Sequence, residues 1–451
     1  MPTKFILLLF AFIIPNNISS QKILKIPFKF YSTSQLFPNQ SDPVTNIYMS
    51  QILIEISIGN PPQKLNCSLN LISFYSLFLS HKIPDIEFPS YYNKNISSTY
   101  NQTKEMTYYW EEDFNYAETF TDKIQLFSLD NKKILDDTFT FLLIDGLGYD
   151  IPNEFYAPGL IGLRLRREEK KQQIDENRFI YQIKKLRLTD TEIFCFDFNK
   201  DDNNGNFVIG EDLFNNENYL KINVGSLYFP TLGLEWSFNF NRIYSGNTEI
   251  KETLDALIKT ENGLTIGPKT YETIIDEFFK SESKCKYIYK KMGYGTFKYY
   301  YCEEDFDENL IEDLVFELKL INFNFTFSGK ELFYTENNIK YFKILFLYSY
   351  NQPYWYFGRD FLKKYKLRFD TERKLIYIPL KEEEDKDANS VPTTNQFHIW
   401  IYIVIILGII ILGLIIFIVV YLKKYPRKKR ANELEEDFDY TQKDKLNENI
   451  N

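Results

Sequence analysis

Histidine is nearly absent from this chain of 451 residues, which contains only His81 and His398. A Ser/His/Asp triad would have to use His81, because His398 adjoins an apolar run near the C-terminus. His81 stands beside Lys82 and is interpreted as a surface loop residue. Zinc motifs of the HExxH and paired-cysteine kinds are missing too. The sequence therefore predicts neither a histidine-based hydrolase nor a metal site.

Glycine-rich phosphate loops are also missing. No GxxxxGK[ST] motif occurs, and no GxGxxG motif stands between a strand and a helix. The dense basic segment KKYPRKKR directly follows a long apolar run, which is more typical of the flank of a membrane span than of a nucleic-acid site. We expect no nucleotide, no other cofactor and no nucleic-acid partner.

The first 20 residues have the features of a secretory signal peptide. Lys4 precedes an apolar run from Phe5 to Ile14, and the small residues Ser19 and Ser20 follow it. The alternative, a first membrane span, is disfavoured because this run is too short to cross about 30 Å of hydrocarbon. Residues 1–20 are therefore predicted to be a signal peptide.

A second apolar segment predicts one membrane span. Residues 399–422 contain no charge, and at about 1.5 Å per residue they are long enough to cross a bilayer. The basic cluster behind them marks the cytosolic side. Residues 381–398 resemble a charged stalk, and residues 423–451 a polar cytoplasmic tail. We expect a single-pass type I membrane protein whose residues 21–398 are extracellular or in a secretory or vacuolar lumen.

Five sequons make this outer part a candidate glycoprotein. The asparagines of N-x-S/T patterns outside the predicted span are Asn39, Asn66, Asn95, Asn101 and Asn324. Each match is weak on its own because asparagine is frequent throughout the chain. The net charge of −9 indicates solubility and nothing more specific.

The residue pattern of the segment before the predicted span is typical of a mostly β protein. Short β-branched and aromatic runs alternate with Gly, Asn, Asp and Pro turns, as in QILIEISIGNPPQKL. Helical periodicity is sparse, and its best case is the spacing of Tyr271, Ile274, Ile275 and Phe278. Two apolar runs, one in each half of the chain, share a strand, loop and strand pattern.

These two runs resemble the signatures of pepsin-like aspartic proteases. ISIGNPPQKLNCSLNLISFYSLFLS is similar to the N-lobe signature, in which Ile-Gly-x-Pro-Pro-Gln is followed by Asp-Thr-Gly-Ser. ALIKTENGLTIGP, from Ala256 to Pro268, resembles the C-lobe copy. Ser97–Tyr100, Pro158–Leu163 and the stretch WYFGRDFLKKYKLRFD are similar to further family segments in the same order.

The resemblance covers about residues 47–380. It implies a mostly β, bilobal pepsin-like fold with an N-lobe at 47–225 and a C-lobe at 226–380 around a peptide-binding cleft. One C-terminal transmembrane helix is expected to follow.

The family's two catalytic aspartates have no counterpart in these runs. Eleven residues after Gly59 the chain has Asn70, and eight residues before Gly267 it has Lys259. The family's mechanism uses two carboxylates that share one proton. An amide does not accept a proton near neutral pH, and a lysine ammonium has no acceptor. The resemblance therefore implies a pseudoprotease with no intact catalytic residue.

The residues next to these positions also differ from the family pattern. Leu71 and Ile72 replace the first Thr-Gly, whereas Thr260 remains in the second and Glu261 replaces its glycine. In the family both threonines join the loops by hydrogen bonds between the lobes, and a leucine side chain cannot.

Three other interpretations of the second loop stay open. Lys259 could form an ion pair with Glu261 or a hydrogen bond with Asn70. A misalignment would make Asp255, four residues before Lys259, the aspartate of interest. Ser73 and Lys259 could form a Ser/Lys nucleophile pair, which proximity by analogy alone supports.

The flap that covers the cleft in the family has tyrosine candidates here. Tyr108 or Tyr109 could take the family's tyrosine position, but residues 107–112 contain no glycine. Because glycine adopts positive φ at low cost, a hairpin tip without it turns differently.

The four cysteines allow three pairings in an oxidising compartment. The resemblance implies a disulfide between Cys285 and Cys302, at the place of the family's C-lobe disulfide. Cys67 and Cys195 then either pair or remain buried thiols.

The sequence thus favours a membrane-anchored ectodomain that binds a peptide or protein segment and does not cleave it. One alternative is an active aspartic endopeptidase. Another is a structural surface glycoprotein with a closed cleft.

Overall fold

The computed structural model describes residues 22–31, 42–73, 75–80, 90–106, 116–146, 157–165, 177–199, 204–211, 213, 216–225, 228–229, 233–251, 254–292, 295–318, 321–348, 353–380 and 413–420. The predicted signal peptide, stalk and cytoplasmic tail lie outside the described residues. So do Asn39, His81, His398 and the flap candidates Tyr108 and Tyr109.

The chain divides into two units, Met1–Lys381 and Glu382–Asn451. In the second unit, residues 413–420 are helical. No helix among the described residues has the length and apolar character needed to span a bilayer. The rest of the predicted span, residues 399–412 and 421–422, lies outside the described part of the chain.

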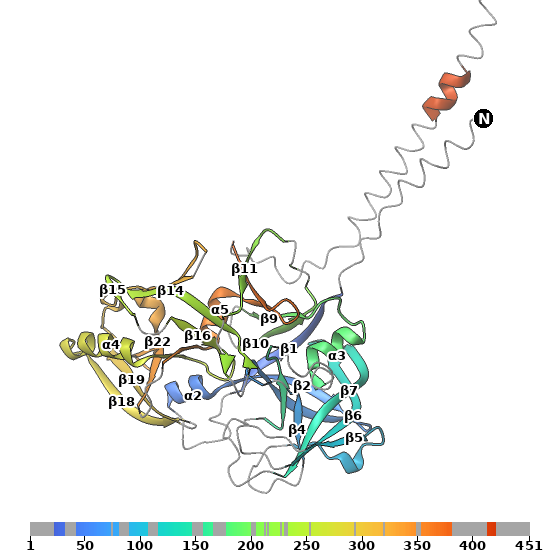
Figure 1. The fold of residues 1–451 in the computed structure, drawn as a ribbon, viewed down its shortest axis with the longest axis horizontal. Helices are drawn as coiled ribbons and strands as arrows, with labels where there is room; N and C mark the ends of the chain where they lie inside the picture. The colour runs from blue at the N-terminus through green and yellow to red at the C-terminus, as the bar shows by residue number, and fades with distance from the viewer. Residues whose placement is uncertain are drawn as a thin grey trace, which may run out of the picture. The chain divides into compact units, whose positions relative to one another are not determined.

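The first unit is built on two large β-sheets, so the prediction of a mostly β chain is confirmed (Figure 1). In spatial order, the described strands of the first sheet are β11 (Tyr219–Asn223), β27 (Leu375–Pro379), β26 (Arg368–Asp370), β9 (Ile193–Phe198), β10 (Asn204–Ile209), β1 (Leu24–Tyr31), β2 (Gln51–Ile58), β3 (Gln63–Asn70), β8 (Gly159–Gly162), β4 (Leu77–Leu79), β7 (Lys133–Gly146), β6 (Tyr116–Phe127) and β5 (Asn101–Met106).

The second sheet is formed by residues 237–357. Its described strands, in spatial order, are β21 (Asn324–Phe327), β20 (Leu314–Leu318), β14 (Ser237–Ser245), β16 (Asp255–Ile258), β25 (Trp355–Phe357), β17 (Thr265–Gly267), β24 (Ile344–Leu347), β19 (Gly295–Glu303), β23 (Ile339–Phe342) and β22 (Phe333–Glu336). β15 (Thr248–Glu249) pairs with β14, and β18 (Cys285–Met292) pairs with β19.

Smaller elements complete the first unit. β12 (Tyr228–Phe229) and β13 (Gly233–Leu234) form a separate two-stranded sheet. The described helices are α2 (Pro43–Met49), α3 (Phe179–Lys185), α4 (Lys269–Ser281) and α5 (Arg359–Tyr365), with short 3₁₀ turns η2 (Lys94–Ile96), η4 (Glu308–Leu310) and η5 (Gly329–Leu332). α4 contains Tyr271, Ile274, Ile275 and Phe278, whose spacing is the best helical pattern in the sequence.

The same four-strand arrangement occurs in both sheets. In the first sheet β3 runs parallel to β8, β8 antiparallel to β4, and β4 parallel to β7. In the second, β16 runs parallel to β25, β25 antiparallel to β17, and β17 parallel to β24. The chain leaving β3 must therefore pass the end of β8 to reach β4, and the chain leaving β16 must pass the end of β25 to reach β17. The two loops identified in the sequence occupy equivalent places.

The two sheets share one apolar core. Trp236, which leads into β14 of the second sheet, packs edge-on against Phe194 and Phe369 of the first at 6.0 and 5.0 Å between ring centroids. Its indole N–H donates to the carbonyl of Leu163 at 2.8 Å. These contacts bury a large aromatic residue where the two halves meet and satisfy its polar atom.

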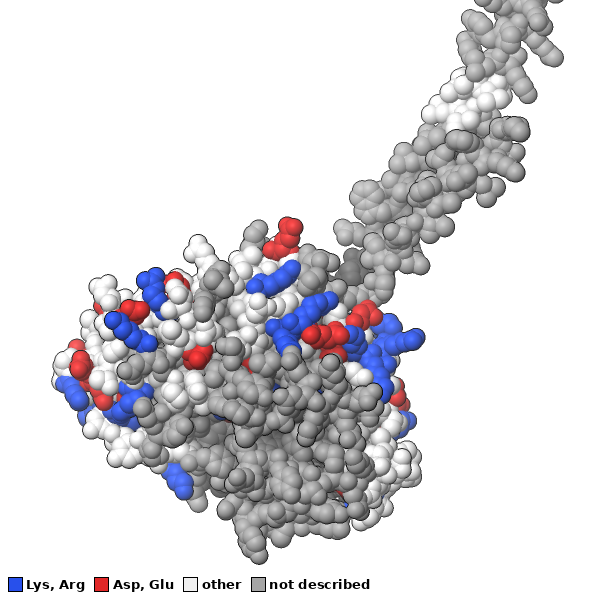
Figure 2. Space-filling model, in the orientation of Figure 1, with Lys and Arg blue, Asp and Glu red and all other residues white. Residues whose placement is uncertain are grey.

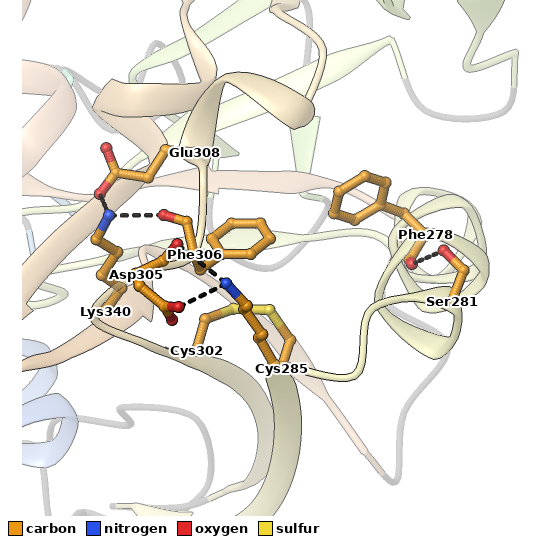
Figure 3. The surroundings of a disulfide bond; sticks show 9 residues. Phe278, Ser281, Cys285, Cys302, Asp305, Phe306, Glu308 and Lys340 are labelled. Atoms are coloured by element: carbon orange, nitrogen blue, oxygen red, sulfur yellow. Dashed lines mark hydrogen bonds and ion pairs between the residues drawn. A yellow bond between two sulfur atoms is a disulfide. The ribbon is translucent and has the colours of Figure 1, made fainter.

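A disulfide joins Cys285 and Cys302, as the resemblance implied. The two residues face each other in the register of the β18–β19 hairpin. Figure 3 shows polar contacts beside it: the Lys340 ammonium donates to the Phe306 carbonyl at 2.7 Å and lies 3.3 Å from a Glu308 carboxylate oxygen. The prediction of this bond is confirmed.

Replacing both Cys285 and Cys302 by serine is expected to lower the free energy of unfolding by about 3 kcal/mol. The bond closes a loop of 17 residues' separation, and opening it raises the conformational entropy of the unfolded chain. Urea unfolding followed by tryptophan fluorescence measures the loss. Wild type kept under a reducing agent should show the same loss, and a double variant as stable as the oxidised wild type would contradict the prediction.

The other two cysteines, Cys67 and Cys195, are buried thiols. Burial raises the pKa of the Cys67 thiol well above its usual value, which keeps it protonated and unreactive. Of the two alternatives left open by the sequence, the structure supports buried thiols.

The described sequon asparagines differ in exposure. Asn95, Asn101 and Asn324 are exposed, whereas Asn66 in β3 is partly buried. Lys and Arg side chains are interspersed with Asp and Glu over the described part of the face in Figure 2. Glycosylation at these positions stays a prediction, with the three exposed residues the most accessible.

Candidate functional site

The first loop begins at Asn70, the last residue of β3. Its side-chain oxygen Oδ1 accepts hydrogen bonds from the backbone N–H groups of Ile72 and Ser73, each at 2.8 Å. Its backbone carbonyl accepts from Leu163 N–H at 2.8 Å, beyond the end of β8. Asn70 is buried, and its amide holds the loop in a tight turn. The oxygen of the amide is thus occupied by donors from its own loop.

The second loop begins at Lys259, immediately after β16. Its backbone N–H donates to the Phe357 carbonyl at 2.9 Å. Its ammonium lies 4.2 Å from the centroid of the Tyr356 ring and 4.0 Å from Oε1 of Glu261. The side chain is 23% exposed. A cation in contact with an aromatic face and a carboxylate is stabilised without full hydration. Of the roles considered for Lys259, the ion pair with Glu261 is the one observed.

Thr260 joins the two loops. Its hydroxyl donates to the Leu69 carbonyl at 2.8 Å and accepts from the Leu71 N–H at 3.2 Å. The threonine is fully buried, so both bonds are shielded from water. Leu71, at the equivalent position of the first loop, has no hydroxyl. The two loops are therefore joined by one threonine, whereas the pattern that the sequence resembles has two. The backbone of Leu71 nevertheless takes part, which its side chain could not.

Glu261 is the one carboxylate of the second loop. Its side chain is 13% exposed, and neither carboxyl oxygen has a well-aligned hydrogen-bond donor among the described residues. Burial raises the pKa of Glu261, and the nearby Lys259 ammonium partly opposes this. Its backbone carbonyl accepts from the Gln51 side chain at 3.2 Å, so the loop is also tied to the start of β2. Glu261 is therefore a buried, titratable group at the candidate site.

Replacing Glu261 by glutamine is expected to stabilise the protein increasingly as the pH rises above about 4.3, the ordinary glutamate pKa. Because the folded pKa is raised, the folded state keeps a proton that the unfolded chain has released, and wild-type stability falls as pH rises through the folded pKa. Urea unfolding of both proteins between pH 4 and 7 measures the difference. The free energy of unfolding of a Lys259→Met variant should fall more steeply as the pH rises, since this variant lacks the ammonium that opposes the rise in the Glu261 pKa. Equal pH profiles of wild type and Glu261→Gln would contradict the prediction.

A buried ion pair contacts the first loop. The Arg164 guanidinium pairs with the Glu235 carboxylate, and their side chains are only 3% and 5% exposed. Arg164 also donates to the Ile72 carbonyl at 3.4 Å through Nη1, and its backbone N–H donates to the Ser73 carbonyl at 3.0 Å. Since Glu235 precedes β14 of the second sheet, this arginine connects the first loop to the other half of the unit.

Arg359 has a corresponding position at the second loop. Its backbone N–H donates to the carbonyl of Asn262, three residues after Lys259, just as Arg164 does to Ser73. Its guanidinium donates to the Ile47 carbonyl at 2.8 Å and to the Ser50 hydroxyl. Burial lowers the pKa of Arg359 to about 10, and Nε and Nη1 have no hydrogen-bond acceptor among the described residues. The two arginines therefore differ, because among the described residues Arg164 has an ion pair with a carboxylate and Arg359 has none.

The other residues proposed from the sequence are placed as follows. The Ser73 hydroxyl donates to the Tyr75 carbonyl at 3.2 Å, so its proton is not directed to Lys259 as a nucleophile pair requires. Asp255 stands at the start of β16, where its carboxylate accepts from the Asn239 side chain at 2.7 Å in the neighbouring strand β14. These contacts give neither residue the geometry of a catalytic group.

The side chains at the starts of the two loops determine which hydrogen bonds the candidate site can offer. Asn70 and Lys259 offer an amide and an ammonium, which donate hydrogen bonds but do not share a proton as two carboxylates do. No group of three or more His, Cys, Asp or Glu side chains among the described residues could hold a metal ion. Sequence reasoning missed Arg164, Glu235 and Arg359. The only signals were their places in the sequence: Arg164 stands two residues after Gly162, the last residue of β8, Arg359 directly follows Gly358 after β25, and Glu235 directly precedes Trp236.

Two comparisons with known proteins bear on this site. A family model described as eukaryotic aspartyl protease matches residues 51–379, which includes both loops and both of the repeated four-strand arrangements. No curated protein matches the chain.

Proposed function

Because the chain belongs to the eukaryotic aspartyl protease family, we propose that its pepsin-like domain binds a peptide or protein segment without cleaving it. The observation that carries this proposal is the pair of groups at the two equivalent loops, Asn70 and Lys259. Neither is a carboxylate, and the amide oxygen of Asn70 already accepts two backbone hydrogen bonds.

The size of the expected loss in catalytic rate supports the proposal. General acid–base catalysis contributes about 10²- to 10⁴-fold to rate, and here both groups that would supply it are replaced. Binding has no such requirement, because the loops remain joined by Thr260 and the surrounding strands are intact. A scaffold of this kind holds a ligand by shape and hydrogen bonds.

We further propose that the domain is held at a membrane by residues 399–422 and delivered there by the signal peptide of residues 1–20. The uncharged length of the first segment and the basic cluster behind it support this. The domain would then act outside the cell or in a lumen, as a receptor, adhesion or assembly factor.

Peptide hydrolysis is the second candidate function, and the observation that favours it is the environment of Glu261. This carboxyl is buried beside Lys259, and its pKa is raised, so it could still take up and release a proton at mildly acidic pH. A second carboxylate opposite it is missing from the first loop, where Asn70 stands.

The deciding experiment measures peptide cleavage by the full-length chain from pH 3 to pH 7, with and without pepstatin. We expect no pepstatin-sensitive turnover, while an active pepsin-like enzyme confirms that the assay works. Pepstatin-sensitive cleavage by wild type that disappears in Glu261→Gln would instead establish the enzyme.

Binding is tested on the same protein with an array of synthetic peptides. We expect peptides that bind wild type to lose affinity for Lys259→Glu and to keep it for Lys286→Glu, an exposed lysine in the β18–β19 hairpin, which is part of neither loop. If no peptide binds wild type, or if both variants behave alike, the loops do not form the binding site.

A further inference from the structure

A cavity of about 470 Å³ lies on the second sheet, apart from the two loops. It opens between η5, α5 and the strands β20, β21 and β24. Its wall is largely apolar and includes Leu314, Phe316, Phe327, Phe333, Ile344 and Phe357. Cavities that bind small ligands usually measure about 300–1,000 Å³ and have apolar walls with a few polar groups. The size and lining therefore suit a small molecule with an apolar body.

More positively than negatively charged side chains surround this cavity. They are Lys330, Glu331, Lys343, Asp360, Lys363 and Lys364. Four lysines thus face two carboxylates, which leaves an excess of positive charge at the rim.

Both carboxylates of the rim are already paired. Glu331 accepts from the Lys364 ammonium at 2.5 Å and from the Ser328 N–H at 2.9 Å. Asp360 lies 3.5 Å from the Lys343 ammonium. No ion pair of Lys330 with a described residue is found, and its side chain is exposed. Lys330 is therefore placed to receive an anion from solution.

We propose that this cavity binds a small amphipathic carboxylate, in which an apolar chain or ring bears one acidic group. The apolar part would lie against the aromatic wall, where burial contributes about 25 cal/mol per Å² of apolar surface removed from water. The carboxylate would remain at the mouth beside Lys330, where it needs only partial desolvation. This site is separate from the proposed peptide site and does not depend on whether peptides are cleaved.

The test uses dodecanoate and the full-length chain held in lipid nanodiscs, with empty nanodiscs as the reference for partition into lipid. Carbon-13 NMR of carboxyl-labelled dodecanoate measures the bound fraction. We expect saturable binding of one dodecanoate per chain, and weaker binding of the uncharged dodecanol. Thr265→Trp should abolish binding, because Thr265 lines the cavity and is half-buried, so that a larger side chain fills the space.

Charge reversal at the rim tests the role of the anion. Lys330→Glu should weaken dodecanoate binding about three- to tenfold, the range for exchanging attraction by repulsion at an exposed position. The control is Lys286→Glu, another exposed lysine, which does not line the cavity and should leave binding unchanged. Absence of saturable binding to wild type would overturn the proposal, as would binding unaffected by Thr265→Trp. Equal binding to wild type and Lys330→Glu would overturn the assignment of the carboxylate to this lysine.

Discussion

Replacing Arg164 by methionine is expected to lower the free energy of unfolding by about 3–5 kcal/mol. The substitution keeps much of the side-chain volume but removes the cation that faces the Glu235 carboxylate, which is 5% exposed. A buried charge that has lost its partner is costly, because the protein interior solvates it poorly. Urea unfolding at pH 7 measures the effect as a shift of the midpoint at unchanged slope.

Arg359→Met is the matched control for this prediction. Arg359 is equally buried and holds the corresponding loop, but it bonds to the Ile47 carbonyl and the Ser50 hydroxyl rather than to a carboxylate. Its loss leaves neutral groups behind, and we expect a cost of about 1–2 kcal/mol. The double variant Arg164→Met/Glu235→Met should recover much of the stability lost in Arg164→Met. If Arg164→Met and Arg359→Met cost the same, the charge of Glu235 is not the reason.

Replacing Thr260 by valine is expected to cost about 2–6 kcal/mol. Valine has nearly the same shape, but it leaves the Leu69 carbonyl and the Leu71 N–H without the hydroxyl that now bonds both. Each buried polar group without a partner costs about 1–3 kcal/mol. The Leu69 carbonyl is in β3 and the Leu71 N–H is in the first loop, whereas Thr260 is in the second loop, so the variant also loosens the junction between the halves.

Thr273→Val in α4 controls for the change of side chain alone. Thr273 is exposed, and its hydroxyl donates to the Lys269 carbonyl within its own helix. Its replacement should change stability by no more than about 0.5 kcal/mol. A Thr260→Val variant that unfolds at the same urea concentration as Thr273→Val would show that the two hydrogen bonds contribute little.

The positions of Asn70 and Lys259 could be predicted from the resemblance to the pepsin-like signatures, in which the catalytic residues stand at a fixed distance from a glycine. Local pattern determines such features, since the strand and the turn that ends it are close in sequence. The resemblance also implied the Cys285–Cys302 pair, and the structure shows that a hairpin brings these residues together in register.

Contacts between distant segments could not be predicted in this way. Arg164 stands in the run Leu-Arg-Leu-Arg-Arg, whose charge suggests a solvated surface, yet it is buried because Glu235 reaches it from the other half. β1 is a second example, since its buried residues Leu24, Ile26 and Phe28 alternate with less buried ones but lie before the segment that resembles the family. Its neighbours β10 and β2 are distant in sequence, and only the folded sheet reveals them.

The last strands of the domain complete its first sheet, so this sheet can close only late in biosynthesis. β26 pairs with β9, and β27 with β11, so residues 368–379 cover an edge whose partner strands were synthesised much earlier. At about 5–20 residues per second, a ribosome delivers this closing pair only after seconds to tens of seconds. Until then β9 is an unpaired edge strand of the nascent chain. Chaperones in the compartment of synthesis would have to keep this edge from pairing with other chains.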